Sequence, residues 1–358
     1  MKFKYKRSSK YAVFPTLVNA WPLLLFLSQK ALIPIGLILG YPLKRRYFEQ
    51  LMMGLILLSI GACILLVQPP NKYEFEHFIG FAGFVVAVVL INLAAYTNQE
   101  RLRRIISIGG LLNACLAIVV FYIHPNMHGL RGLNFIDNRY GVPTRFFIAT
   151  TSLLAVVNFD FIKQKMLRYI FYFIVIFYLV ELARSILVLL VLVSDKYLNT
   201  IMRASLVTKF AFFFAILVFG VLASIGILIY RPDLLLSAGF KLFQLETLSR
   251  YLDHIIFGYG WGFVIHLLAT SPKQPYQIEM QLPMLVIQVG LIYVSLYLLW
   301  MYWMLRSVSE TKVVAFARFI TYSIVGFVNP WLFLPTWYLT SALLYRNIEL
   351  SNTSIEAK

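Results

Sequence analysis

The chain has 358 residues, of which 60% are hydrophobic and only 13% are charged, and its mean hydropathy is +0.78. Because soluble domains carry about 25% charged residues, this composition excludes a soluble protein and predicts an all-α integral membrane protein. The net charge of +17 is spread over short basic clusters between apolar runs. That distribution is typical of membrane proteins, so we expect membrane lipids as partners and no nucleic acid.

Apolar runs of bilayer-crossing length predict about twelve transmembrane helices. Only Lys30 interrupts the first pair, and Glu181 and Arg184 lie at the junction of the short seventh and eighth spans. With no repeat and no soluble segment, residues 1–358 are predicted to form a single transmembrane domain. The approximate span limits are 11–28, 29–43, 49–67, 77–96, 104–123, 144–160, 167–183, 185–200, 207–230, 279–304, 313–328 and 331–346.

Basic residues predict the orientation of these spans. Five of them precede the first span, which places the N-terminus in the cytoplasm. Twelve crossings return the C-terminus to that side and also put the later basic clusters there, namely 44–46, 101–104, 163–168, 196–203 and 306–312. Function is then expected in the segments that face outward, which are 68–75, 124–144, the corner at 181–184 and 231–277.

The one long outward loop, 231–278, lies between the ninth and tenth predicted spans. Residues 234–256 have the apolar spacing of a helix that lies along the membrane surface. In this segment, Arg250 has the planar fork that binds diphosphate, although it would also suit lipid headgroups. The glycine-rich sequence Gly258–Gly262 lacks the context of a dinucleotide fingerprint. It predicts a tight turn with positive φ, with phosphate binding by backbone amides as the alternative.

Two further charged residues adjoin apolar spans. Arg184 is costly at such a position, which points to function, although Glu181 lies three residues before it on the same helix face. Glu279 begins the tenth span, either as a cap favoured by the helix dipole or as a general base for an acceptor hydroxyl.

Polar residues of the outward stretch 129–145 are candidates to bind sugar hydroxyls, although an ordinary polar loop has the same composition. No outward set of side chains completes a metal shell, so neither a metal nor another cofactor is expected. The candidate sugar-binding residues, with His254 of the later loop, are Arg131, Asn134, Asp137, Arg139 and Tyr140.

Four short motifs occur in order from Arg184 to the C-terminus. The first is Arg184-Ser185, followed by an apolar run, and the second is Ser249-Arg250, followed by Ile256-Phe257-Gly258-Tyr259-Gly260. The third is Glu279-Met280, then nine residues, then Gly290-Leu291-Ile292, and the fourth is Asn329-Pro330-Trp331. Together they resemble the O-antigen polymerase and ligase superfamily of bacterial envelope enzymes. Ligases of that superfamily have His-Asn, nine residues, then Gly-x-x-Gly. The spacing therefore matches, while Glu279 replaces the His and Tyr293 the second Gly.

The resemblance implies a GT-C-like glycosyltransferase of the bacterial inner membrane, with a periplasmic site and no metal. In such an enzyme Arg184 and Arg250 hold the diphosphate of an undecaprenyl-linked glycan. Glu279 deprotonates the acceptor hydroxyl at the non-reducing end of another lipid-linked repeat unit, and the transfer inverts the anomeric centre. The resemblance also implies a chain-length-regulating membrane protein as a partner.

Two other functions stay open. A ligase that transfers finished polymer to lipid A–core is the alternative within the superfamily, and the missing His favours the polymerase. A flippase for lipid-linked oligosaccharide is the alternative of another class. It would place charged residues at mid-membrane and show related halves, whereas here they cluster at one face.

Overall fold

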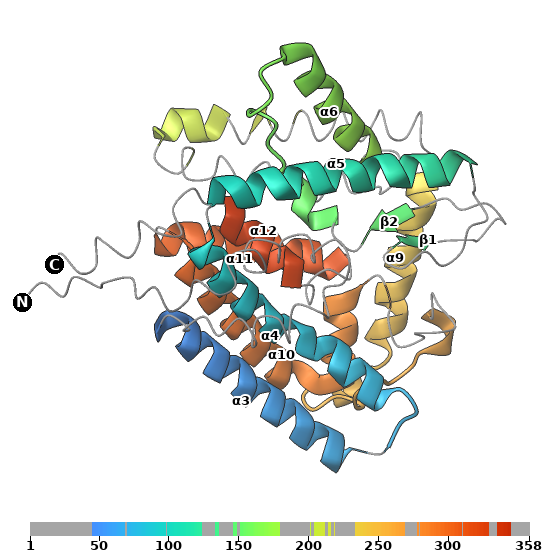
Figure 1. Ribbon diagram of the computed structural model, residues 1–358. Helices are drawn as coiled ribbons and strands as arrows, with labels where there is room; N and C mark the ends of the chain where they lie inside the picture. Colours follow the sequence, from blue (N-terminus) through green and yellow to red (C-terminus); the bar gives the residue numbers. More distant parts are fainter. Residues whose placement is uncertain are drawn as a thin grey trace, which may run out of the picture. The chain divides into compact units, whose positions relative to one another are not determined.

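The computed structural model describes residues 45–68, 70–97, 99–123, 133–135, 146–148, 151–179, 201, 204–211, 214–215, 218, 233–268, 278, 280–309, 311–328 and 335–344. Among these residues, regular structure is helical apart from one ladder of two short strands. They divide into two compact units. Figure 1 labels the helices and strands that make up these units. The first contains α5, β1, β2, η3 and α6, and the second contains α3, most of α4, and α9 to α12. That the chain forms one domain stays a prediction.

Four of the described helices are long and apolar enough to cross a membrane. At about 1.5 Å of rise per residue, each exceeds the roughly 30 Å of the hydrocarbon layer. They coincide with the third, fourth, fifth and tenth predicted spans. The helical, membrane-type fold is therefore confirmed in this coarse form, and the count of twelve and the GT-C architecture stay predictions. The four helices are α3 (Arg45–Val67), α4 (Glu74–Tyr96), α5 (Gln99–Ile123) and α10 (Gln281–Ser307).

Several shorter helices also lie where the sequence predicts helix. α6 (Lys165–Phe177) occupies the first part of the seventh span, and α11 (Lys312–Val328) and α12 (Pro335–Leu344) occupy the last two. In the loop predicted to face outward, α9 (Asp233–Ser249) and the short η5 (Leu252–His254) confirm that 234–256 is largely helical, and its place at the membrane surface stays a prediction. The spans at 11–28, 29–43 and 185–200 lie outside the described residues, as does most of 207–230.

The predicted helix at 144–160 is wrong. β2 (Phe146–Ile148) pairs antiparallel with β1 (Leu133–Phe135), and a 3-10 turn, η3 (Thr151–Val156), follows it. Beyond η3, Asn158 Oδ1 accepts a hydrogen bond from the Asp160 N–H at 2.8 Å, a local bond that competes with helix formation. The segment nevertheless runs back along α5, because Leu154 packs on Gly110 and Asn158 bonds to Ser107.

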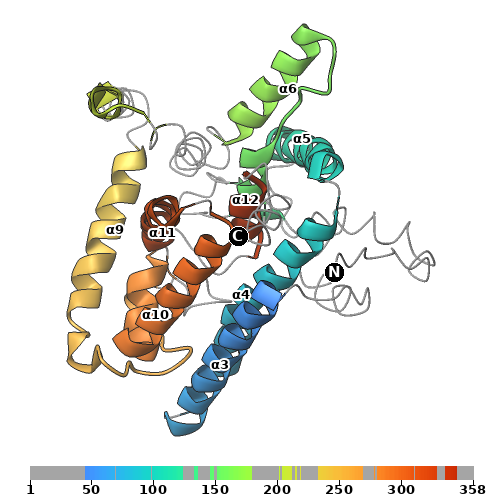
Figure 2. The same ribbon diagram turned by 90° about the vertical axis from the view of Figure 1, so that its left-hand side faces the viewer.

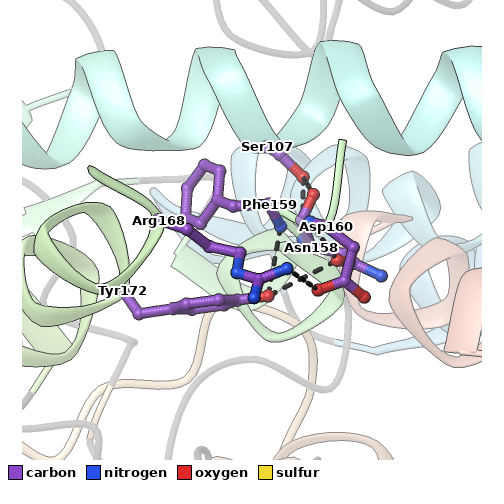
Figure 3. A network of polar contacts seen from close by, with 6 residues as sticks. All are labelled: Ser107, Asn158, Phe159, Asp160, Arg168 and Tyr172. Atoms are coloured by element: carbon purple, nitrogen blue, oxygen red, sulfur yellow. Dashed lines mark hydrogen bonds and ion pairs between the residues drawn. The ribbon is translucent and has the colours of Figure 1, made fainter. Parts of the chain in front are cut away.

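A polar network fixes the loop between η3 and α6 (Figure 3). Ser107 of α5 exchanges hydrogen bonds with the backbone of Asn158, accepting from its N–H at 2.9 Å and donating to its carbonyl at 3.2 Å. Tyr172 of α6 accepts from the Phe159 N–H at 3.1 Å and donates to Asn158 Oδ1 at 3.4 Å. The loop is thus bonded to both helices, and Asn158 is the centre of the network.

In the second unit, α10 contacts α3 and α11 directly, and α9 lies beside the N-terminal part of α10 (Figure 2). The core between α4 and α10 is aromatic. Phe84 meets Tyr297 and Trp300 edge-on, with ring centroids 5.4 and 4.6 Å apart, and Phe81 continues the stack toward Trp261 at 5.1 Å. Large flat side chains of this kind bury much area and fix the mutual orientation of the helices.

The tenth span is present but interrupted. Gly290 has φ 85° and ψ 157°, so α10 consists of two helical parts. The turn that follows η5 fills the break, because the Tyr259 N–H donates to Ile287 O at 2.9 Å and the Gly260 N–H to Gln288 O at 2.7 Å. Leu291 N–H donates back to Ile255 O at 2.7 Å. Backbone groups freed by the break are satisfied by protein rather than left bare in hydrocarbon.

Gly290→Ala is expected to prevent correct folding. Its positive φ disfavours a side chain, and a Cβ there would lie 2.3 Å from Ile256 O, a backbone atom. We expect a loss of roughly 3 kcal/mol or more of unfolding free energy. The matched control is Gly239→Ala in α9, where no atom lies within 4 Å of the added Cβ. Melting temperature and size-exclusion profile in detergent measure both, and equal stability of the two variants contradicts the interlock.

Tyr172→Phe is expected to destabilise the unit that contains α5 and α6. Removing the hydroxyl leaves the Phe159 N–H without its acceptor, at a cost of about 1 kcal/mol. Tyr169→Phe is the control, because that exposed side chain lies on the same helix and donates no hydrogen bond among the described residues. Hydrogen exchange of the Phe159 amide should rise in the first variant and stay unchanged in the second.

Candidate functional site

The predicted site residues fall unevenly on the described structure. Arg250 and His254 belong to the second unit, and Asn134 lies in β1 of the first, opposite Phe147 in the ladder. The two remaining members of the predicted catalytic set, Arg184 and Glu279, lie outside the described residues. So do four of the sugar-binding candidates, Arg131, Asp137, Arg139 and Tyr140.

Arg250 stands directly after the end of α9. Its N–H donates to Thr247 O, so the last turn of the helix fixes its backbone. The side chain is 68% exposed and pairs with Glu246, equally exposed, at 3.1 Å. Exposed pairs at this spacing contribute little to stability, so a diphosphate with several charges would displace the carboxylate readily. Arg250 is therefore anchored at its backbone and accessible at its guanidinium.

The turn Gly258–Gly262 has the predicted positive φ values, 75° at Gly258, 114° at Gly260 and 71° at Gly262. The expectation of a tight turn is thus confirmed. Between the last two glycines, Trp261 is only 1% exposed and its Nε1–H donates to Gly61 O of α3 at 2.9 Å. The Gly262 N–H donates to His77 Nδ1 of α4 at 3.0 Å. The amides of Tyr259, Gly260 and Gly262 are thus all bonded to protein, which leaves them unavailable to a phosphate.

After α9 the structure brings His254, a predicted sugar-binding residue, together with Asp253, Tyr259 and Phe263, which the sequence does not single out. Tyr259 stacks on Phe263 with ring centroids 4.6 Å apart and an interplanar angle of 16°. Its hydroxyl donates to Asp253 Oδ1 at 2.5 Å, and His254 Nε2 lies 3.6 Å from Asp253 Oδ2. Asp253 and His254 are 63% and 62% exposed. Their spacing from Tyr259 follows no helical period, so the sequence held no signal for this contact.

The contact between Asp253 and Tyr259 shifts the pKa of both groups. The hydrogen bond from Tyr259 lowers the pKa of Asp253 below its ordinary 3.8. The same bond raises the pKa of Tyr259 from 10.0 to about 12. At neutral pH Asp253 is a carboxylate and Tyr259 a phenol, which is the pairing that their hydrogen bond needs.

A buried cluster lies beneath this surface. Ile278 and Met280, the two neighbours of Glu279 in the chain, pack with Leu248 of α9. The Met280 N–H also donates to Gln244 Oε1 of α9 at 3.3 Å. Leu248 precedes Arg250 by two residues. The residues that flank Glu279 in sequence are thus held against the end of α9 that carries Arg250.

Comparison of the chain with models of protein families and with the sequences of curated proteins gave no match. The resemblance to the polymerase and ligase superfamily therefore stays a prediction that rests on the motifs.

The titration of Tyr259 tests the contact with Asp253. Because the pKa of Asp253 is lowered, the contact stabilises the folded protein above about pH 4. This stabilisation is lost as the pH falls through the lowered pKa of Asp253. Because the pKa of Tyr259 is raised, that contribution persists below about pH 10 and disappears as the pH rises through about 12. Near pH 11, we expect about a tenth of Tyr259 to be ionised in the wild type and a clearly larger fraction in Asp253→Asn.

The difference in phenolate absorbance between each protein and its Tyr259→Phe version isolates this one tyrosine. Asp160→Asn, which removes another exposed carboxylate, is the control and should leave the titration unchanged. Identical curves for the wild type and Asp253→Asn would show that the hydrogen bond is absent.

Proposed function

We propose that the chain is a membrane-embedded, metal-independent glycosyltransferase that polymerises an undecaprenyl-diphosphate-linked repeat unit of a bacterial surface polysaccharide. One observation carries the proposal. The buried cluster of Leu248, Ile278 and Met280 joins the segment around Glu279 to the end of α9, where Arg250 presents an exposed guanidinium. The proposed cation and the proposed base thus come from two segments that pack on each other.

The reaction needs few protein groups. The acceptor hydroxyl attacks the anomeric carbon, its proton passes to Glu279, and the bond from that carbon to the diphosphate oxygen breaks. The leaving undecaprenyl diphosphate carries away the electron pair, and Arg250 with Arg184 stabilises the charge. Tyr259 contacts the ring of Tyr251, the residue after Arg250. With Asp253 and His254 it offers acceptors, donors and an aromatic ring to a sugar.

The broken helix weighs against the transporter alternative. Transporters use the carbonyls of an interrupted helix to hold ions or substrate near mid-membrane. In this chain Ile287 O and Gln288 O, the carbonyls just before the break, accept hydrogen bonds from Tyr259 and Gly260. The break therefore holds the turn that follows η5, with these two carbonyls already engaged.

Arg250→Ala is expected to abolish polymer formation, since the loss of one charge-stabilising donor costs roughly 10²–10³-fold in rate. Arg45→Ala is the matched control, because Arg45 also forms an exposed pair with a glutamate four residues away. Arg184→Ala and Glu279→Gln are expected to behave like Arg250→Ala. The readout is surface polysaccharide length on a gel, in a deletion strain complemented with each variant at equal membrane abundance.

The gel distinguishes the three functions. Single repeat units on the finished glycolipid, in place of a ladder, identify a polymerase. Polymer that stays on its lipid carrier identifies a ligase, and repeat units that never reach the outer face identify a flippase. Full activity of Glu279→Gln contradicts its role as base and leaves the diphosphate site standing.

A further inference from the structure

Two basic clusters that are distant in sequence meet in the unit that contains α5 and α6. The first, Arg101–Arg104, begins α5, and the second, Lys163–Arg168, begins α6. Arg104 lies over the ring of Phe161, 5.6 Å from its centroid, and the network around Asn158 bonds the intervening loop to both helices (Figure 3). The positive-inside rule places both clusters on the cytoplasmic side. The structure adds that they are neighbours.

This surface is strongly positive. Its two acids are each engaged by an arginine of the surface, Glu100 by Arg104 and Asp160 by Arg168. Lys163 and Lys165 are exposed and form no ion pair among the described residues. Lys165 also begins α6, whose first turn contains no acid. A cation at the N-terminus of a helix opposes the helix dipole. Stabilisation of α6 therefore does not explain why these lysines are present.

An apolar stripe begins directly after the lysines. α6 exposes large side chains at helical spacing, while its other face packs on Phe159 through Phe171 and Tyr172. The stripe ends near the C-terminus of the helix. Its members are Met166, Tyr169, Ile170, Phe173 and Ile176. Lysines followed by an apolar stripe match the two parts of a phospholipid, an anionic headgroup and its acyl chains.

We propose that Lys163 and Lys165 bind the phosphate of an anionic phospholipid whose acyl chains lie along the exposed stripe of α6. Arg104 pairs with Glu100 and Arg168 with Asp160, so neither acid competes for the two lysines. The hydrogen bonds of Asn158 hold the loop between η3 and α6 in place. The site therefore exists before the lipid arrives, which reduces the entropy lost on binding. It does not depend on the glycosyltransferase proposal.

The test uses the full chain, purified in detergent and titrated with phosphatidylglycerol or with phosphatidylcholine of the same acyl chains. Native mass spectrometry counts the bound lipids. We expect the wild type to prefer phosphatidylglycerol by roughly tenfold and Lys163→Gln/Lys165→Gln to lose most of that preference. The control, Lys72→Gln/Lys312→Gln, removes two exposed lysines elsewhere and should retain it. Melting temperature without lipid confirms that the variants fold.

Phe173→Ser tests the apolar half of the site. It should weaken binding of both lipids by a similar factor and leave the preference between them unchanged, because the headgroup contacts remain. Equal binding of the two lipids by the wild type overturns the proposal. It is also overturned if the control double variant loses as much preference as Lys163→Gln/Lys165→Gln, since the effect then comes from net charge alone.

Discussion

The backbone pairing between the turn after η5 and the break in α10 is the constraint on which the second unit depends. A helix interrupted inside a membrane frees amide and carbonyl groups, each costing several kcal/mol if left unsatisfied. Here Tyr259, Gly260 and Ile255 supply the partners. The approach is so close that glycine is required on both sides, since a Cβ at Gly258 would lie 2.4 Å from Gln288 O. The turn and the helix therefore form one structural piece.

That constraint reaches the candidate site in two steps. Trp261, in the middle of the turn, is buried among aromatic residues of α4 and α10 and bonds to α3, so the turn cannot move without disturbing three helices. Tyr259, two residues earlier, stacks on Phe263 and bonds to Asp253, three residues after Arg250. Exposed polar groups are thus attached to a rigid base, which is the arrangement that favours precise binding of a charged substrate.

The sequence predicts much of this fold because bilayer length and helical period are local signals. It places α3, α4, α5 and α10 correctly and predicts the positive φ values of the glycine turn. It fails where contacts between distant segments decide the outcome. The break at Gly290 depends on a turn about thirty residues earlier, and the contact of Asp253 with Tyr259 depends on a non-helical path. The stretch 144–160 is apolar enough for a span, but Phe146–Ile148 pairs with β1 and Asn158 bonds to Ser107 of α5, so contacts outside the stretch decide its structure.

The two units use charge in opposite ways. Around α5 and α6, cations follow one another closely and each acid is taken up by an arginine of the same surface, so the surplus charge is diffuse and suits any anionic headgroup. At the end of α9, Arg250 pairs with Glu246, and Asp253 and His254 follow three and four residues later, so this segment carries no surplus of positive charge. A balanced site gains little from a general negative surface. It gains from a ligand that offers phosphate to the cation and hydroxyl groups to the carboxylate and imidazole together, and the substrate we propose, a glycan linked through diphosphate, offers both.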